Sequence, residues 1–178
     1  TEEIIAGYDI DPTRVFVAGL SAGGAMALVL AAAHPNLYAA AGIHSGLPYQ
    51  SANDVMSAFA AMRGDARPPR PQPGIRKIIF HGDADSTVHP SNAAAIAHAP
   101  RGRKPEPSQH SAQDGQGRSY SKTVWRDQNG AAVTEQWIVH GAGHAWSGGS
   151  SDGSFTDPRG PDASAQMVRF FMSGDGAE

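Results

Sequence analysis

The sequence predicts an α/β fold with a mainly parallel sheet, and two observations carry this prediction. Short apolar runs rich in β-branched residues alternate along the chain with helical segments, an order that implies parallel strands covered by helices on both faces. Glycine and proline, 21 and 13 of 178 residues, punctuate the chain between these segments and indicate many loops. A chain of this length fits one domain, so we expect residues 1–178 to fold as a single unit.

The elements of the first half follow from local patterns. Residues 1–8 carry apolar side chains at helical spacing and stop at an Asp–Pro break. Residues 14–19 are an apolar run typical of a buried parallel strand, and the alanine-rich segment 22–33 predicts a helix that ends at a His–Pro pair. After these we expect, in order, a strand over 37–44, an amphipathic helix over 54–62, an extended proline-rich linker over 67–74, a strand over 76–80 and a surface helix over 91–98.

The second half predicts a polar loop, a hairpin and a last helix. The segment 99–117 is rich in glycine, proline and glutamine, a composition that predicts a mobile loop. Two alternating segments, 119–125 and 133–139, flank an Asn-Gly pair and predict a β-hairpin. A glycine- and serine-rich loop over 141–161 and a helix over 163–172 complete the chain.

Composition excludes several classes of protein and of site. The formal net charge is −3, which argues against nucleic acid or an anionic membrane as partner, because both need a basic surface. The chain has no cysteine, so disulfides, cysteine-ligated zinc and a thiol nucleophile are excluded. No apolar run approaches the roughly 18 residues that indicate a membrane span.

The segment from Gly19 to Gly23, GLSAG, matches the G-x-S-x-G pattern of a nucleophile elbow. The predicted strand precedes it and the predicted helix follows it, so a sharp turn would hold Ser21 out of the sheet as a nucleophile. The two glycines would let strand and helix approach closely. The N–H of Ala22 is predicted to be an oxyanion donor, and Leu20 is a candidate for substrate contact. A chance Gly/Ser turn is the alternative, which the flanking strand and helix disfavour.

Two aspartates follow the strand predicted over 76–80, where the sites of open α/β sheets lie. Asp85 is the preferred triad acid, which would hold an imidazole in the productive tautomer. Asp83 is the alternative acid and is expected instead to cap the turn. The segment also permits a plain surface turn, or a metal site of His81, Asp83, Asp85 and His89. Nothing else in the sequence supports a metal, so none is predicted.

His144 follows the last predicted strand within the segment GAGHAW, whose glycines would let the backbone carry it toward the nucleophile as general base. His140 and His144 have the spacing of a helical zinc pair, but the intervening glycines disfavour a helix, and His140 is expected at a strand end. Trp146 is equally compatible with lining a substrate groove and with packing beneath the loop. The other histidines are expected to be structural or solvated: His34, His44, His89, His98 and His110.

Ser21, Asp85 and His144 occur in the chain order of an α/β-hydrolase triad. The set predicts acyl transfer through a covalent acyl-serine. Three functions stay open at this point: an active carboxylic ester hydrolase, a different hydrolase such as a peptidase or thioesterase, and an inactive remnant or interaction module.

Three segments, VFVAGLSAGGAMA, FHGDADSTVHPSN and GAGHAWSGGSSDGSFTDPRGPDASAQMVRFF, resemble the polyhydroxybutyrate depolymerase family of esterases, which includes feruloyl and acetylxylan esterase-like members. The resemblance covers nearly the whole chain. It implies an α/β-hydrolase fold with Ser21 as nucleophile, Asp85 as acid and His144 as base, acting without a cofactor on a polyester or a small acyl ester. It also implies an extracellular or periplasmic location.

The chain departs from that family at its N-terminal side, where members carry roughly a further half-domain. We therefore expect residues 1–178 to be a single, N-terminally truncated α/β-hydrolase catalytic domain whose sheet lacks the N-terminal strands. The loop that gives the second oxyanion donor would be absent, which is why an inactive fragment remains an alternative. The strand over 14–18 would become an exposed apolar edge, and we expect chains to associate with one another through it.

Overall fold

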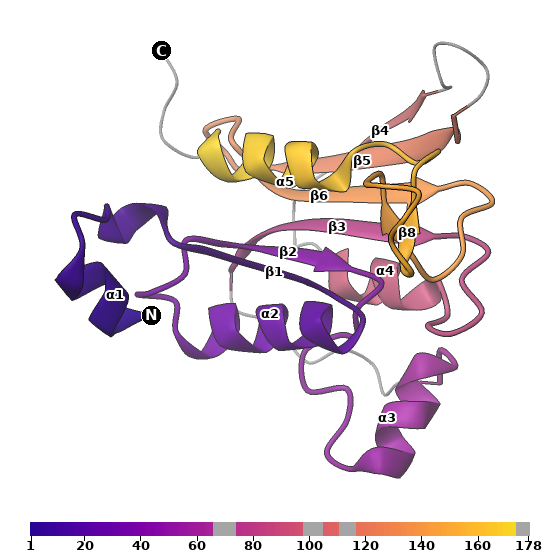
Figure 1. Ribbon diagram of the computed structural model, residues 1–178, viewed down its shortest axis with the longest axis horizontal. Coiled ribbons are helices and arrows are strands. Elements are labelled where there is room, and N and C mark those ends of the chain that lie inside the picture. The colour runs from indigo at the N-terminus through magenta and orange to yellow at the C-terminus, as the bar shows by residue number, and fades with distance from the viewer. Residues whose placement is uncertain (66–73, 98–104, 111–116, 174–178) are drawn as a thin grey trace.

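A six-stranded sheet with helices on both faces forms the centre of the molecule (Figure 1). The computed structural model describes residues 1–65, 74–97, 105–110 and 117–173. The strand order is β1-β2-β3-β6-β5-β4; β1, β2, β3 and β6 run parallel, whereas β5 and β4 pair antiparallel with their neighbours. The elements are α1 (Glu2–Gly7), a 3₁₀ turn (Pro12–Arg14), β1 (Phe16–Leu20), α2 (Ala22–Ala33), β2 (Ala40–His44), α3 (Val55–Met62), β3 (Arg76–Gly82), α4 (Ser91–Ala97), β4 (Pro105–His110), β5 (Tyr120–Arg126), β6 (Ala132–Val139), β7 (Trp146–Ser147), β8 (Thr156–Asp157) and α5 (Ala163–Met172).

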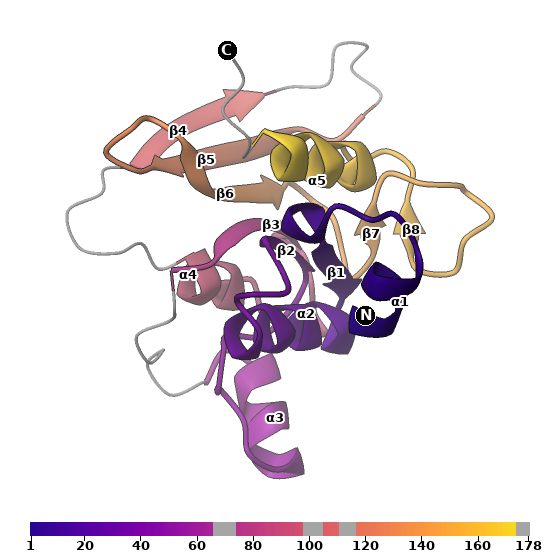
Figure 2. The ribbon, with the colours of Figure 1, turned by 90° about the vertical axis from the view of Figure 1, so that its left-hand side faces the viewer.

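The alternation of side chains along β3 divides the core into two layers. Ile78 and Phe80 pack with Met167 of α5, whereas Ile79 packs with residues of α2 and α4 such as Leu28. Successive residues of a strand point to opposite faces, so the continuous apolar run of β3 covers both layers. Figures 1 and 2 show α5 on one side of the sheet and α2 and α4 on the other. The predicted α/β fold with a mainly parallel sheet is therefore confirmed.

α4 differs from the prediction in its burial. The sequence led us to expect a surface helix over 91–98, but Ala93, Ile96 and Ala97 are buried in the layer that α2 and α4 share. Alanine side chains are short, so the helix lies close against β3 and β6. A helix composed mainly of alanine carries too weak an apolar pattern for its buried face to be recognised from sequence.

A second correction concerns the polar stretch 99–117. Residues Pro105–His110 form β4, which pairs antiparallel with β5 at the edge of the sheet. Such pairing uses backbone groups, so a polar segment without apolar alternation can form it. Residues 98–104 and 111–116 lie outside the described residues, as do 66–73 of the predicted linker. The predicted loop 141–161 contains the short parallel pair β7 and β8.

α3 projects from the side of the molecule that carries α2 (Figures 1 and 2). Asp54 caps it: its carboxylate accepts from the N–H of Ser57 at 2.8 Å, and the Ser57 hydroxyl oxygen accepts from the N–H of Asp54 at 3.1 Å. The apolar side chains Val55, Met56 and Phe59 are exposed. Within the part of the chain that the structure describes, no helix is long and apolar enough to cross a bilayer.

β1 lies at the opposite edge of the sheet from β4 among the described residues. Its Phe16 ring stacks on Phe171 of α5 with centroids 4.8 Å apart, which ties the strand to the core. This position agrees with the edge expected for this strand. Association of chains through β1 stays a prediction.

Candidate active site

Ser21 occupies the sharp turn between β1 and α2. Its backbone has φ 57° and ψ −121°, a conformation that costs a residue other than glycine of order 1–3 kcal/mol and that the surrounding structure must enforce. The N–H of Ser21 donates to the carbonyl of His44, at the end of the neighbouring strand β2, at 2.8 Å. Ala22 is the first residue of α2, and such a residue has no intrahelical acceptor for its N–H. The turn therefore combines a strained serine with a donor at a helix N-terminus.

The close approach of β1 and α2 depends on two glycines, of which the sequence pattern indicates only one. A Cβ on Gly19 would lie 2.3 Å from the carbonyl carbon of Gly23, so Gly19 has to be glycine, as predicted. A Cβ on Gly23 would meet nothing within 4 Å. A Cβ on Gly24 would lie 2.9 Å from the carbonyl oxygen of Gly19. The prediction for Gly23 was therefore wrong, because the helix turns Gly24 toward the strand.

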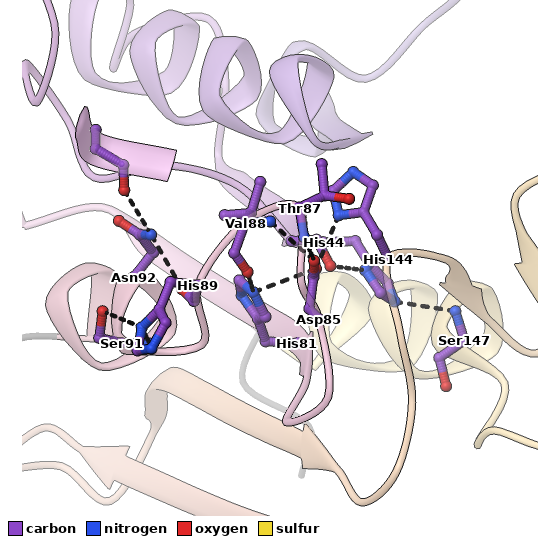
Figure 3. Close-up of polar contacts among 12 residues, drawn as sticks. His44, His81, Asp85, Thr87, Val88, His89, Ser91, Asn92, His144 and Ser147 are labelled. Atoms are coloured by element: carbon purple, nitrogen blue, oxygen red, sulfur yellow. Dashed lines mark hydrogen bonds and ion pairs between the residues drawn. The ribbon is translucent and has the colours of Figure 1, made fainter. Parts of the chain in front are cut away.

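Asp85 lies in the loop after β3, and both oxygens of its buried carboxylate have partners (Figure 3). Oδ1 accepts from the N–H groups of Thr87 and Val88 at 2.9 and 2.8 Å, and Oδ2 accepts from His144 Nδ1 at 2.8 Å. Burial by itself would raise the pKa of Asp85, but the hydrogen bonds from Val88, His144 and Thr87 outweigh it and lower the pKa. The carboxylate is therefore held in its ionised form.

The contact with Asp85 defines the tautomer of His144. An ionised carboxylate can only accept, so Nδ1 carries the proton and Nε2 of the neutral imidazole remains an acceptor. The two loops are neighbours because β3 and β6, which they follow, pair in parallel. Among the described residues no hydrogen bond joins Ser21 to His144. Contacts between nucleophile and base are often long without substrate and tighten when it binds.

Asp83, the alternative acid, binds other partners. Its carboxylate accepts from His140 Nδ1 at 2.8 Å and from the N–H of Gly141 at 2.6 Å, so it caps the loop after β6 instead of its own turn. His89 contacts Ser91 Oγ at 2.8 Å. Of the side chains considered for a metal, Asp83 and His89 therefore bind separate partners. The described ranges contain no group of three or more His, Cys, Asp or Glu side chains that could hold a metal ion.

His44 is a buried neighbour of the site that the sequence did not single out. Its Nε2 accepts from the N–H of Ser147 at 2.9 Å, and its ring lies against Trp146 and Phe80 with centroids 5.2 and 5.8 Å away. Through its hydrogen bond with Ser147, the His44 imidazole links the loop after His144 to the end of β2 (Figure 3). The sequence feature that could have indicated this role is the position of His44 at the end of the strand that follows the nucleophile elbow.

His81 lies beside the Asp85 carboxylate. Its Nε2 donates to the carbonyl of Val88 at 2.8 Å and lies 3.5 Å from Asp85 Oδ2. Burial lowers the pKa of His81, so the ring is neutral. Its Nδ1 is buried and has no hydrogen-bond partner among the described residues. The bond to Val88 closes the loop that carries the acid.

The buried imidazole of His44 makes stability depend on pH. Burial first, and then the neighbouring His81, lowers the pKa of His44 from 6.5 to about 3. Above pH 6.5 the ring is neutral in the folded and the unfolded chain. Below pH 6.5 His44 binds a proton in the unfolded chain but stays neutral in the folded chain. The free energy of unfolding therefore falls as pH falls, until about pH 3. Between pH 7 and 5 we expect a loss of about 2 kcal/mol from His44 alone.

Urea unfolding at pH 7 and pH 5 measures this loss. His44→Gln removes one titrating group and should reduce the dependence by about 2 kcal/mol, leaving the part that the buried His81 contributes, whereas His34→Gln, at an exposed histidine, should behave as the parent chain does. An equal pH dependence in the parent chain and in His44→Gln would contradict the assignment.

The two residues predicted to contact substrate are only partly buried. Trp146 donates from Nε1 to Ser164 Oγ at 3.1 Å and packs against the core cluster under α5. Packing beneath the loop thus accounts for its contacts. Leu20 ends β1, where it pairs with His44. Substrate contact by either side chain stays a prediction.

A mainly parallel sheet, a serine on a strained strand-to-helix turn and an Asp–His pair after two later strands place the chain in the α/β-hydrolase class. Two solved structures share this fold. An acetyl xylan esterase from Aspergillus awamori matches with a TM-score of 0.62 at 23% identity, over 96% of this chain and 63% of that one. A PHB depolymerase from Penicillium funiculosum matches with a TM-score of 0.58 at 18% identity, over 94% of this chain and 54% of that one.

Within that class the chain belongs to the esterase PHB depolymerase family, whose sequence model matches residues 1–99. It is 32% identical over 155 residues to a poly(3-hydroxyalkanoate) depolymerase C of Paucimonas lemoignei, covering 78% of this chain and 37% of that protein. It is 36% identical over 107 residues to a probable acetylxylan esterase A of Aspergillus fumigatus, covering 49% and 29%. The family resemblance is therefore confirmed, and the chain spans about a third of the length of these curated relatives.

Proposed function

We propose that this chain carries the Ser–His–Asp centre of a carboxylic ester hydrolase, with Ser21 as nucleophile, His144 as base and Asp85 as acid. The observation that supports this most directly is the 2.8 Å bond from His144 Nδ1 to the buried, ionised Asp85. It leaves His144 Nε2 free to accept a proton. Ser21 has the strained backbone that exposes a nucleophile at the top of such a sheet.

In the proposed reaction, Ser21 Oγ attacks the ester carbonyl carbon and its proton passes to His144 Nε2. The Ala22 N–H donates to the oxyanion as it forms. The ester C–O bond then breaks, and His144 returns the proton to the departing alkoxide oxygen. A water molecule repeats the sequence on the acyl-serine, so that the acid leaves and Ser21 regains its proton. Asp85 stays ionised throughout and stabilises the imidazolium. These steps need no cofactor.

For the substrate we propose an ester of a hydroxy acid, of the kind joined in a polyester, because two of the relatives matched over most of this chain are depolymerases of poly(3-hydroxyalkanoate) and poly(3-hydroxybutyrate). The acetylxylan esterases among the relatives and solved structures favour a second candidate, an acyl ester on a plant polysaccharide such as an acetyl or feruloyl group. An extracellular or periplasmic location, which the family resemblance implies, belongs to the same proposal.

Labelling with a fluorophosphonate probe, read by intact mass and peptide mapping, tests the nucleophile. We expect one adduct on the parent chain, located at Ser21, and none on Ser21→Ala. Ser121→Ala is the matched control, because Ser121 Oγ lies 2.8 Å from the imidazole of His140, and its removal should leave one adduct. A well-folded parent chain without an adduct would overturn the proposal and favour an interaction module. A panel of esters, thioesters and peptides then separates ester hydrolysis from the other hydrolase reactions.

A further inference from the structure

The loops that carry the proposed acid and base lie in close contact along their first residues. The N–H of Asp83 donates to the carbonyl of Val139 at 3.1 Å, and the N–H of Ala84 donates to the carbonyl of Ala142 at 3.0 Å. A Cβ on Gly82 would lie 2.2 Å from that same Ala142 oxygen, so the two backbones touch where β3 ends. Asp85 and His144 follow this contact by one and two residues. The interactions that hold these two loops together therefore also determine whether Asp85 and His144 form their hydrogen bond.

The Asp83 carboxylate bridges the two loops with both oxygens. Oδ1 accepts from the N–H of Gly141 at 2.6 Å and Oδ2 from His140 Nδ1 at 2.8 Å. Burial alone would raise the pKa of Asp83, but these two bonds and the charge of Arg118 outweigh it and lower the pKa. Asp83 is therefore an anion that binds the base loop just before His144.

His140 extends the bridge to a third element. Because Asp83 only accepts, Nδ1 of His140 carries a proton, and Nε2 of the neutral ring accepts from the hydroxyl of Ser121 on β5 at 2.8 Å. The chain thus contains a second Ser–His–Asp set, and in this one both contacts are hydrogen bonds. Its serine, however, lies within a regular strand that pairs with β6, without a positive φ and without a helix N-terminus behind it. The second set lacks the turn and the oxyanion donor that acyl transfer needs.

We infer that Asp83 and His140 are positioning residues for the proposed ester hydrolysis, and that they hold the loop of His144 in the place where its Nδ1 meets Asp85. The inference rests on the proposed function. The fold supplies adjacent loops, but two glycines, Gly141 and Gly143, leave the backbone before His144 free to turn. The bond from Gly141 to Asp83 restricts the backbone at Gly141, the first residue of this loop. A displacement of about 1 Å at a catalytic group can cost about 100-fold in rate.

The two substitutions at Asp83 that test this differ in which bonds they preserve. Asp83→Ala removes both bonds to the base loop. Asp83→Asn keeps them if His140 changes tautomer: the amide oxygen accepts from Gly141, the amide N–H donates to His140 Nδ1, and Nε2–H donates to the Ser121 hydroxyl, which can accept as well as donate. Asp127→Ala is the matched control, since Asp127 likewise accepts two hydrogen bonds, here from the backbone N–H groups of Asn129 and Ala131, in the turn at the opposite end of β6.

The readouts are the rate of fluorophosphonate labelling at Ser21, kcat and KM for a soluble ester, and the tautomer of His144 from its imidazole ¹⁵N shifts. For Asp83→Ala we expect labelling and kcat to fall about 10- to 100-fold with KM little changed, and His144 to populate both tautomers. Asp83→Asn should recover most of the loss, and Asp127→Ala should match the parent chain in rate and tautomer.

Three results would overturn the inference: Asp83→Ala reacting as fast as Asp127→Ala, Asp83→Asn reacting as slowly as Asp83→Ala, or an adduct mapped to Ser121. The tautomer needs no activity to be measured. If the parent chain itself fails to react at Ser21, the proposed function fails, while a single Nδ1–H tautomer of His144 that persists in Asp83→Ala still overturns the positioning role.

Discussion

Replacing Asp85 by Asn should lower ester turnover by roughly 10⁴-fold, the loss seen when a triad acid becomes an amide. The amide oxygen can still accept from the N–H groups of Thr87 and Val88, so the loop keeps its shape. The amide N–H₂ group then faces His144 Nδ1 and imposes the tautomer with its proton on Nε2. That nitrogen can no longer accept the proton of Ser21. We therefore expect kcat to fall with KM nearly unchanged.

Asp83→Asn is the natural comparison, because it makes the same chemical change two residues away in the same loop. The expected outcomes are opposite: a loss of several orders of magnitude at Asp85, and most of the rate retained at Asp83. Initial rates on a soluble ester and imidazole ¹⁵N shifts of His144 in the two variants measure both. Comparable rates in the two variants would leave the choice of Asp85 as the acid without support.

The parts of the site that sequence predicts are those tied to one local segment. The turn at Ser21 needs only a strand, a glycine and a helix in succession, and the helix over 22–33 begins and ends at the predicted residues. Asp85 and His144 each follow a recognisable strand, and parallel strands bring their C-terminal ends to one edge of the sheet. Their meeting could therefore be expected without any knowledge of the loops between.

The parts that sequence does not predict depend on partners far away along the chain. His44 acquires its role from Ser147, which is 103 residues away, and from the ring of Trp146. Likewise, Asp83 is an ordinary turn aspartate until His140 and Gly141 come beside it. β4 was missed for a different reason, because its pairing with β5 uses backbone groups that leave no side-chain pattern. For His44 and Asp83 the missing information is a long-range contact.

The two glycines of the G-x-S-x-G pattern should respond differently to the same substitution. In Gly19→Ala the new methyl would lie 2.3 Å from the carbonyl carbon and 2.4 Å from the carbonyl oxygen of Gly23. These are backbone atoms of α2, so relief requires the helix to move away from β1. Overpacking of this kind commonly costs 1–3 kcal/mol when side chains can adjust, and here they cannot, so we expect a loss of at least about 3 kcal/mol in the free energy of unfolding.

Gly23→Ala is the matched control within the same five residues. Its methyl would meet nothing within 4 Å, and alanine is favoured over glycine in a helix by up to about 1 kcal/mol. We therefore expect a free energy of unfolding between the parent value and about 1 kcal/mol above it, with fluorophosphonate labelling at Ser21 preserved. Urea unfolding of the two variants measures the difference, and equal stabilities would contradict the assigned packing. The G-x-S-x-G pattern treats Gly19 and Gly23 alike, but only Gly19 is enclosed by backbone atoms. The helix turns Gly23 away from the strand and places Gly24 against it.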